Sequence, residues 1–301
     1  MSLSIHDSMI RVVLTCSVLS VSAIGCRHER VERSSTEELR FDAGERAVVE
    51  VRVDDGRVEI IGGEPGVVEV VFTNRARAAD SAGARALLEN IRTDAVRDGD
   101  VVRVRERAGT GGAATLGGSA WSEVAIRVPP ESSEIDIRID DGRIEIQDVS
   151  GTIRAETGDG RIRVSDVRGN VKLRTHDGSV TGTSLDGNFD VLTEDGRIRL
   201  DGSFSRLRAV TGDGSIRVTV RDLTVISDEW SLRTSDGSIE LSLPDSLAAN
   251  LEATSGDGRV TNNLSRFEGS ERQNRVKGAL GPGGPRILVT TMDGRIVLKE
   301  S

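Results

Sequence analysis

The sequence predicts an all-β protein: a single-stranded parallel β-solenoid of 18-residue coils, with a small inserted helix and strand segment near the N-terminus. Three observations predict it. The pair Asp-Gly recurs at intervals of 18 residues, and apolar residues follow each pair at fixed offsets. Aromatic residues make up only 2% of the chain, too few to fill one large globular core. We expect the coils to wind in the right-handed sense.

The regular part of the repeat contains five Asp-Gly pairs. We interpret them as a structural turn ladder, because Gly gives the backbone freedom at a corner and Asp can accept nearby backbone N–H groups. Thr stands two residues before four of the pairs, where we expect it to hydrogen-bond along the stack. The pairs are Asp141 and Gly142, Asp159 and Gly160, Asp177 and Gly178, Asp195 and Gly196, and Asp213 and Gly214.

An apolar residue stands two positions after each of these glycines, and in most coils a second one follows two positions later. Residues two apart point to the same side of a strand, and stacked coils bring equivalent residues about 4.8 Å apart. We therefore expect one continuous aliphatic core. A meander of hairpins is the alternative, since Asp-Gly also marks hairpins, but it does not require constant spacing. The residues expected to form a single file are Ile144, Ile162, Val180 and Ile198.

The register loosens towards the C-terminus. The next pairs begin at Asp236, Asp257 and Asp293, so the coils carry insertions, one of them the loop 280–285. We expect the last motif, which ends at Leu298, to close the stack.

The N-terminal part contains one further coil. The segment 49–60 matches 135–146 almost position by position, so the solenoid is expected to begin near Ala47. Residues 72–130 look like an insertion that caps the stack, with a helix and two strands. We therefore expect two domains: residues 46–130, which contain the first rung and its inserted cap, and residues 131–299, which contain the repeats. Within the cap we expect a helix over residues 79–91 and strands over residues 101–104 and 124–128.

The first 45 residues predict export. The apolar run 12–24 is too short to span a bilayer and lies between Arg11 and Cys26, the layout of a signal peptide over residues 1–25; a start at Met9 would fit that layout better. Residues 23–26 resemble a lipobox, which implies lipidation of Cys26 and a membrane anchor. Residues 26–45 are expected to be a polar tether, and Arg27 favours the outer over the inner membrane.

The repeated units, together with the segment 124–146, resemble the bacterial putative-adhesin domain family of unknown function. The resemblance covers about residues 45–299. It implies a β-solenoid at the cell surface or in the periplasm, and it brings no catalytic residues with it.

Candidate chemistry is sparse. A net charge of −9 argues against a nucleic-acid partner. His176 and the adjacent Asp177 are the one candidate ligand site. They leave open the alternative that the protein is a polysaccharide-active β-helix enzyme centred on these two residues. The Asp column could also hold calcium, but the chain lacks the loop of calcium β-rolls. We expect no metal, no cofactor and no catalytic residue.

These inferences favour a non-catalytic cell-envelope lipoprotein, an adhesin or scaffold that contacts an unknown envelope polymer or protein along its solenoid surface. An envelope-stress accessory protein is a further alternative, suggested only by the resemblance.

Overall fold

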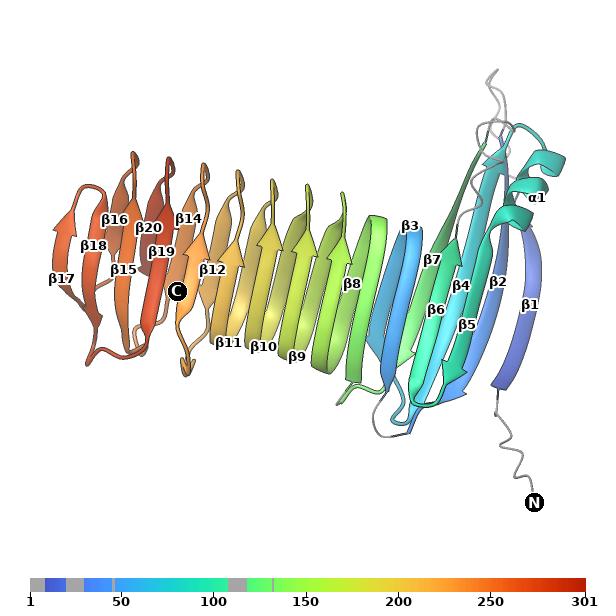
Figure 1. Cartoon of the computed structure of the whole chain (residues 1–301), viewed down its shortest axis with the longest axis horizontal. Helices are drawn as coiled ribbons and strands as arrows, with labels where there is room; N and C mark the ends of the chain where they lie inside the picture. Colours follow the sequence, from blue (N-terminus) through green and yellow to red (C-terminus); the bar gives the residue numbers. More distant parts are fainter. Residues whose placement is uncertain (1–8, 20–29, 45–46, 108–117, 132) are drawn as a thin grey trace. The chain divides into compact units, whose positions relative to one another are not determined.

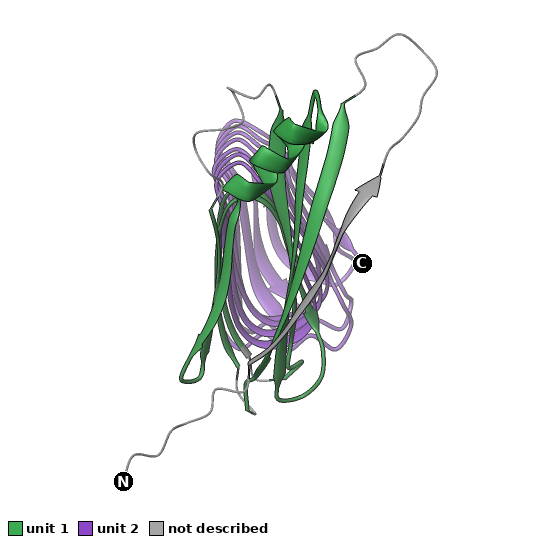
Figure 2. Cartoon of the chain, turned by 90° about the vertical axis from the view of Figure 1, so that its right-hand side faces the viewer, with its two compact units in different colours: residues 1–145 green, residues 146–301 purple. Residues whose placement is uncertain are grey.

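The computed structural model describes residues 9–19, 30–44, 47–107, 118–131 and 133–301, most of them in β-strands (Figure 1). The chain divides into two compact units, residues 1–145 and 146–301 (Figure 2). The long strand β8 (Ser133–Thr157) contributes residues to both units.

Unit 2 is a stack of coils. Strands β9 (Arg161–Thr175), β10 (Ser179–Thr193) and β11 (Ile198–Val210) each run through both halves of a coil, and later coils use a separate strand for each half. The separate strands are β12 (Ile216–Val220), β13 (Trp230–Arg233), β14 (Ile239–Leu243), β15 (Ala249–Ser255), β16 (Val260–Asn263), β19 (Arg286–Thr291) and β20 (Ile296–Glu300).

The first half-coils of unit 2 form one parallel ladder, and its inward residues form the predicted file. Val180 pairs with Ile162 on one side and with Ile198 on the other, and all three are fully buried. Ile144 is also buried but belongs to unit 1. The file continues along the ladder through Ile216, Ile239, Ile296 and Val260.

The second half-coils form another parallel ladder, and their inward side chains complete the core. Its largest members are aromatic: Phe204 packs edge-to-face on Phe189 at 5.6 Å and on Trp230 at 6.2 Å between ring centroids. The two halves of a coil join at a corner where Asp166 and Ser184 adopt left-handed φ values of +53° and +54°. Asp tolerates this conformation because its short polar side chain can hydrogen-bond locally.

The order of the last coils differs from the expectation. The C-terminal coil does not close the stack, because β20 pairs with β14 on one side and with β16 on the other. Likewise β19 lies between β13 and β15. The chain therefore reaches the end of the stack at β15 and β16 and then returns to insert its final coil one position back.

A hairpin covers the outer edge at that end. Strand β18 (Arg275–Leu280) pairs antiparallel with β15, and β17 (Phe267–Arg272) pairs antiparallel with β18. Most of the β17 side chains are exposed and polar, a composition that discourages pairing with another chain.

Unit 1 contains the predicted first coil, strand β3 (Val48–Gly62), which pairs with β8. The insertion does more than cap it. Strands β6 (Val101–Arg107) and β7 (Ser119–Val128) pair in parallel with the two halves of β3, so they add a further rung. The parallel stacking in unit 1 therefore starts one rung before β3.

Beyond that rung the pairing becomes antiparallel. Strand β5 (Arg92–Asp98) pairs with β6, and β4 (Val67–Ala78) pairs with β7. The predicted helix is present as α1 (Ser81–Asn90), where Asp80 caps the N-terminus by accepting from the Gly83 N–H at 2.7 Å. Ala84 and Leu87 of α1 pack on Ala76 and Ala78 of β4.

The expected polar tether is wrong for residues 31–42. They form β2 (Val31–Asp42), which pairs antiparallel with β4 along its whole length, and Leu39 and Phe41 are buried. Backbone pairing places this charged segment in the sheet although its side chains are mostly polar. Residues 9–19, within the expected signal peptide, form β1 (Met9–Leu19), antiparallel to β2. Cys26 lies outside the described residues.

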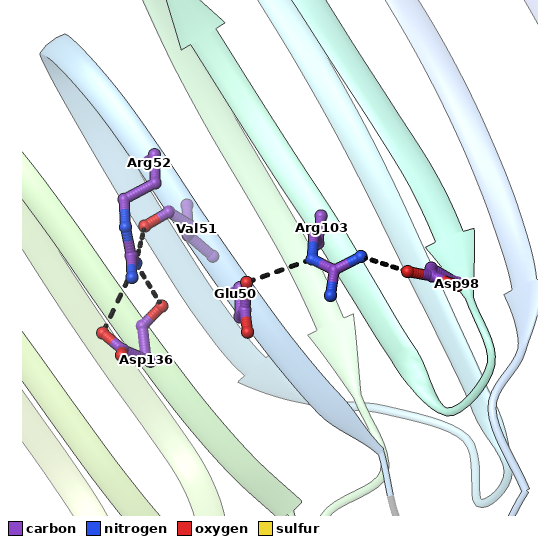
Figure 3. A network of polar contacts seen from close by, with 6 residues as sticks. All are labelled: Glu50, Val51, Arg52, Asp98, Arg103 and Asp136. Carbon is purple, nitrogen blue, oxygen red and sulfur yellow. Dashed lines mark hydrogen bonds and ion pairs between the residues drawn. The ribbon is translucent and has the colours of Figure 1, made fainter.

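Ion pairs link neighbouring rungs of unit 1 (Figure 3). Arg103 of β6 donates to Glu50 of β3 at 3.3 Å and to Asp98 at 2.6 Å. Arg52 of β3 donates to the backbone carbonyls of Val51 and Asp136, at 2.8 and 3.2 Å, and so reaches β8.

Candidate functional surface

The Asp-Gly corners of unit 2 lie over one another as the repeat predicts, but the glycines serve a different purpose. A Cβ added at Gly178 would lie 1.5 Å from the carbonyl oxygen of Gly160, and one at Gly196 equally close to that of Gly178. Neither glycine has a positive φ. Glycine is therefore required because successive rungs approach closely, not because the corner needs unusual dihedral angles.

Threonine hydroxyls satisfy backbone carbonyls at these corners. The buried Thr193 hydroxyl lies 2.9 Å from the carbonyl oxygen of His176 and 3.2 Å from that of Gly178, on the preceding rung. At the corner of the C-terminal coil, Gly294 donates its N–H to the Thr291 hydroxyl at 3.2 Å. From Thr175 onwards the threonine column therefore links each rung to the one before, as expected. Equivalent contacts are made by Thr175, Thr211, Thr234 and Ser255. The buried hydroxyl of Thr157 is the exception, because it has no hydrogen-bond partner among the described residues.

The Asp side chains form an exposed column along this corner. Burial and the neighbouring Asp213 and Asp293 carboxylates raise the pKa of Asp236. Asp293 neighbours Asp236 because of the interleaved order, although Asp257 follows Asp236 in the sequence. Within the described residues, no group of three or more His, Cys, Asp or Glu side chains is arranged to hold a metal ion.

His176 lies on the same corner and pairs with a residue that the sequence did not suggest. Its Nδ1 lies 3.1 Å from Glu194 Oε1 of the next rung, and both side chains are more than 60% exposed. This partner is Glu194, not Asp177. A solvated pair of this kind lacks the desolvation that tunes a catalytic acid or base.

Sequence reasoning missed a buried carboxylate in unit 1. Glu106 at the end of β6 is only 2% exposed, and its Oε2 accepts from the Asp54 backbone N–H at 3.1 Å. Burial raises the pKa of Glu106 to about 7, and the charges of Asp54 and Asp55 act in the same direction. The alternation Val102, Val104, Glu106 could have revealed it, because it continues the inward side of the strand.

The insertion that the spacing before Asp236 predicts lies between β12 and β13, and the missed feature is its exposed apolar tip. Leu223 at its tip is 89% exposed with φ of +64°, and Val225 is 77% exposed, whereas Ile226 is buried and anchors the loop. Nothing in the structure indicates what would cover these two apolar side chains.

The family of the chain follows from its sequence. A family model described as Toastrack DUF4097 matches residues 68–299, well over half of the chain. The chain belongs to this family. The match begins in β4 and ends in β20, so it takes in the added rung, β8 and nearly all of unit 2.

Solved structures similar to this Toastrack chain are distant. A "putative cell adhesion protein" from Clostridium sporogenes is 10% identical, with a TM-score of 0.28 over 90% of this chain and 100% of that chain. A "putative adhesin" from Bacteroides fragilis is 10% identical, with a TM-score of 0.32 over 89% of this chain and 97% of that chain. A "putative lipid binding protein" from Parabacteroides distasonis is 12% identical, with a TM-score of 0.38 over 88% and 96%.

A search of curated proteins gave no significant match. Within the part of the chain that the structure describes, no helix combines the length and the apolar character needed to cross a membrane.

Proposed function

We propose that this Toastrack protein is a non-catalytic lipoprotein of the cell envelope, which uses the outer surface of its right-handed coils to contact an extended polymer or protein. The observation that carries the proposal is repetition. Outward positions of β9, β10, β11 and β12 recur in register on successive rungs, so polar and charged side chains are presented at regular intervals along a line. Such a surface suits a partner that is itself extended.

Lipid anchoring at Cys26 is the second part of the proposal. Cleavage before Cys26 would remove β1 and leave β2 as an edge strand of unit 1. Half of the twelve residues of β2 are charged, and charged side chains are a common protection of sheet edges against unwanted pairing. The composition of β2 therefore suits a mature protein that begins at Cys26, and Arg27 after it favours the outer membrane.

The anchor is tested by labelling. The full chain is expressed in a Gram-negative host that is fed an alkyne-tagged fatty acid, and the membranes are separated. We expect label on the wild type and on Cys16→Ala, the matched control, but not on Cys26→Ala. Equal labelling of Cys26→Ala and wild type, or none on either, would refute the anchor.

The enzyme alternative gains no support from the geometry of His176. Its test is a screen for shortening of acidic glycans by the full chain and by the His176→Ala and Asp177→Asn variants. We expect none from any of the three. Turnover by the wild type that both substitutions abolish, with the fold intact, would replace the scaffold by an enzyme.

A further inference from the structure

One outward surface of unit 2 has an unusual composition. It consists of the outward side chains of the first half-coils of β9–β12, and we call it the arginine face. Twelve positions contribute five Arg, six Ser or Thr and a single Asp, with no aromatic or aliphatic side chain. They are Arg161, Arg163, Ser165, Ser179, Thr181, Thr183, Arg197, Arg199, Asp201, Ser215, Arg217 and Thr219.

The positive charge of this face is only partly neutralised from within the protein. Glu240 of β14 accepts from Arg217 at 2.9 Å. Arg197 and Arg199 ion-pair with none of the described residues, and both are exposed. The one acidic member of the face, Asp201, is occupied by Arg221 from the next loop. Arg197 and Arg199 lie two residues apart on the same side of one rung, and like charges this close repel one another, so the arrangement favours an anionic partner.

The arginines are also spaced regularly. Pairs on β9 and β11 flank the hydroxyl rung of β10, which has Ser179 and Thr181 at the equivalent positions. With rungs about 4.8 Å apart, the two arginine pairs lie about 9.6 Å from each other. Guanidinium groups bind carboxylates through two parallel hydrogen bonds, and the hydroxyls between them can donate to or accept from neutral polar groups.

The other half-coils differ in this respect. There Arg208 lies 2.9 Å from Asp190, and Arg206 lies 3.8 Å from Asp228. Lys172, Arg174 and Arg233 of these half-coils have no carboxylate partner among the described residues, but Asp190 lies in register between Lys172 and Arg208 and would repel an anion there. The arginine face is therefore the better anion site of the two.

We propose that the arginine face binds an acidic polysaccharide that carries a carboxylate on alternate sugars, with the hydroxyl rung of β10 contacting the neutral sugar between two charged ones. The proposal rests on the proposed function, of which it names the partner class. Duplex DNA fits less well, because its charges lie about 1.7 Å apart along the axis. Single strands are read by stacking on aromatic side chains, and this face has none.

The test uses size-defined hyaluronan oligosaccharides as the probe, dextran as the neutral control and duplex DNA as the dense polyanion. Binding to the full chain in detergent micelles is measured by titration calorimetry. We expect binding to hyaluronan that weakens as salt rises, no binding to dextran, and weaker binding to DNA.

The decisive variants copy a neighbouring rung, so that each new residue already occurs at that position of a coil. Arg197→Ser with Arg199→Thr reproduces the β10 rung and should weaken hyaluronan binding at least tenfold. Arg161→Ser with Arg163→Thr does the same on β9, if the first variant fails to fold. The control, Arg206→Asn with Arg233→Thr, removes two charges from the other half-coils and should change affinity less than twofold.

No hyaluronan binding, equal losses in the control and in the arginine-face variants, or tighter binding to DNA would overturn the proposal. Chain length of the hyaluronan is checked after each titration. Shortened hyaluronan would instead contradict the non-catalytic function, and loss of fatty-acid labelling would contradict only the anchor, so the failures are distinguishable.

Discussion

At the scale of single residues, close backbone approach explains the repeat better than turn conformation does. Only glycine fits at positions 178 and 196, because a Cβ at either position would overlap the backbone carbonyl of the preceding rung. Gly99, at the turn between β5 and β6, represents the other reason for glycine, since it has φ of +62° and open space around its Cα. The two kinds of glycine should therefore respond differently to the same substitution.

Gly196→Ala should lower the free energy of unfolding by about 3 kcal/mol or more, because the rungs of unit 2 would have to separate. Gly99→Ala should cost only about 1 kcal/mol, from the left-handed backbone alone. Urea unfolding followed by circular dichroism compares the two. Equal losses would mean that the corner can relax around a methyl group and that glycine is not needed for stacking.

At the scale of elements, the sequence predicts which residues form a rung but not where the rung lies. The file through Ile162, Val180 and Ile198 follows from period and polarity, which each coil carries by itself. The motifs at Asp257 and Asp293 are equivalent in sequence, so either fits beside the coil of Asp236. Long-range pairing decides between them, and a linear pattern contains no such information.

The same limit applies to the N-terminal elements and to the candidate sites. A polar segment such as β2 joins the sheet through its backbone, which hydrophobic periodicity does not reveal. The corner of His176 was predictable from spacing, whereas its partner Glu194 was not, because it lies one coil away. Glu106 was overlooked because a charged residue in a strand is usually assigned to the solvent side.

Disulfide trapping tests the interleaved order of the last coils. Thr290 of β19 lies in register with Arg233 of β13 and with Thr254 of β15. In a Cys16→Ser, Cys26→Ser background, Arg233→Cys with Thr290→Cys and Thr254→Cys with Thr290→Cys should each oxidise readily, since adjacent rungs lie within disulfide reach.

The matched control is Arg233→Cys with Thr254→Cys. These positions would be neighbours if the coils stacked in sequence order, but they are two rungs, about 9.6 Å, apart in the interleaved order. Thiol counting under mild oxidation should find this pair reduced. Ready oxidation of the control pair, with slow oxidation of the Arg233→Cys, Thr290→Cys pair, would instead support the sequential stack. The pair at positions 254 and 290 is adjacent in both orders and serves as the positive control.

At the scale of the whole molecule, the two units should respond to pH in opposite ways. In unit 1, burial raises the pKa of Glu106 to about 7 from an ordinary value of 4.5. Its contribution to stability is therefore fully present below about pH 4.5 and is lost as the pH rises through 7. The groups that face it are Asp54 and Asp55, which oppose ionisation further.

In unit 2, ion pairs and hydrogen bonds act in the reverse direction. The Lys299 ammonium lowers the pKa of Glu240, and the Arg275 guanidinium lowers that of Glu252. The Ser265 hydroxyl lowers the pKa of Glu300. Stability from these three carboxylates is present above about pH 4.5 and is lost as the pH falls through their lowered values.

Each unit contains one tryptophan, which allows the two responses to be separated. Trp121→Phe leaves Trp230 to report on unit 2, and Trp230→Phe leaves Trp121 to report on unit 1. Thermal unfolding followed by fluorescence should show unit 1 becoming more stable from pH 8 to pH 5, by up to about 3 kcal/mol. Unit 2 should change little over that range and lose stability below pH 4.5.

Adding Glu106→Gln to the Trp230→Phe chain should raise the stability of unit 1 at pH 8 and flatten its pH dependence, because the amide stays neutral. Glu131→Gln removes an exposed carboxylate of the same unit and should leave the profile unchanged. If Glu106→Gln destabilises unit 1 equally at pH 5 and pH 8, the carboxyl is ionised in the folded protein across that range, as it is in the unfolded chain, and the pH response has another origin. If the stability of both units changed with pH in the same way, these carboxylates would not be the cause of the pH dependence of either unit.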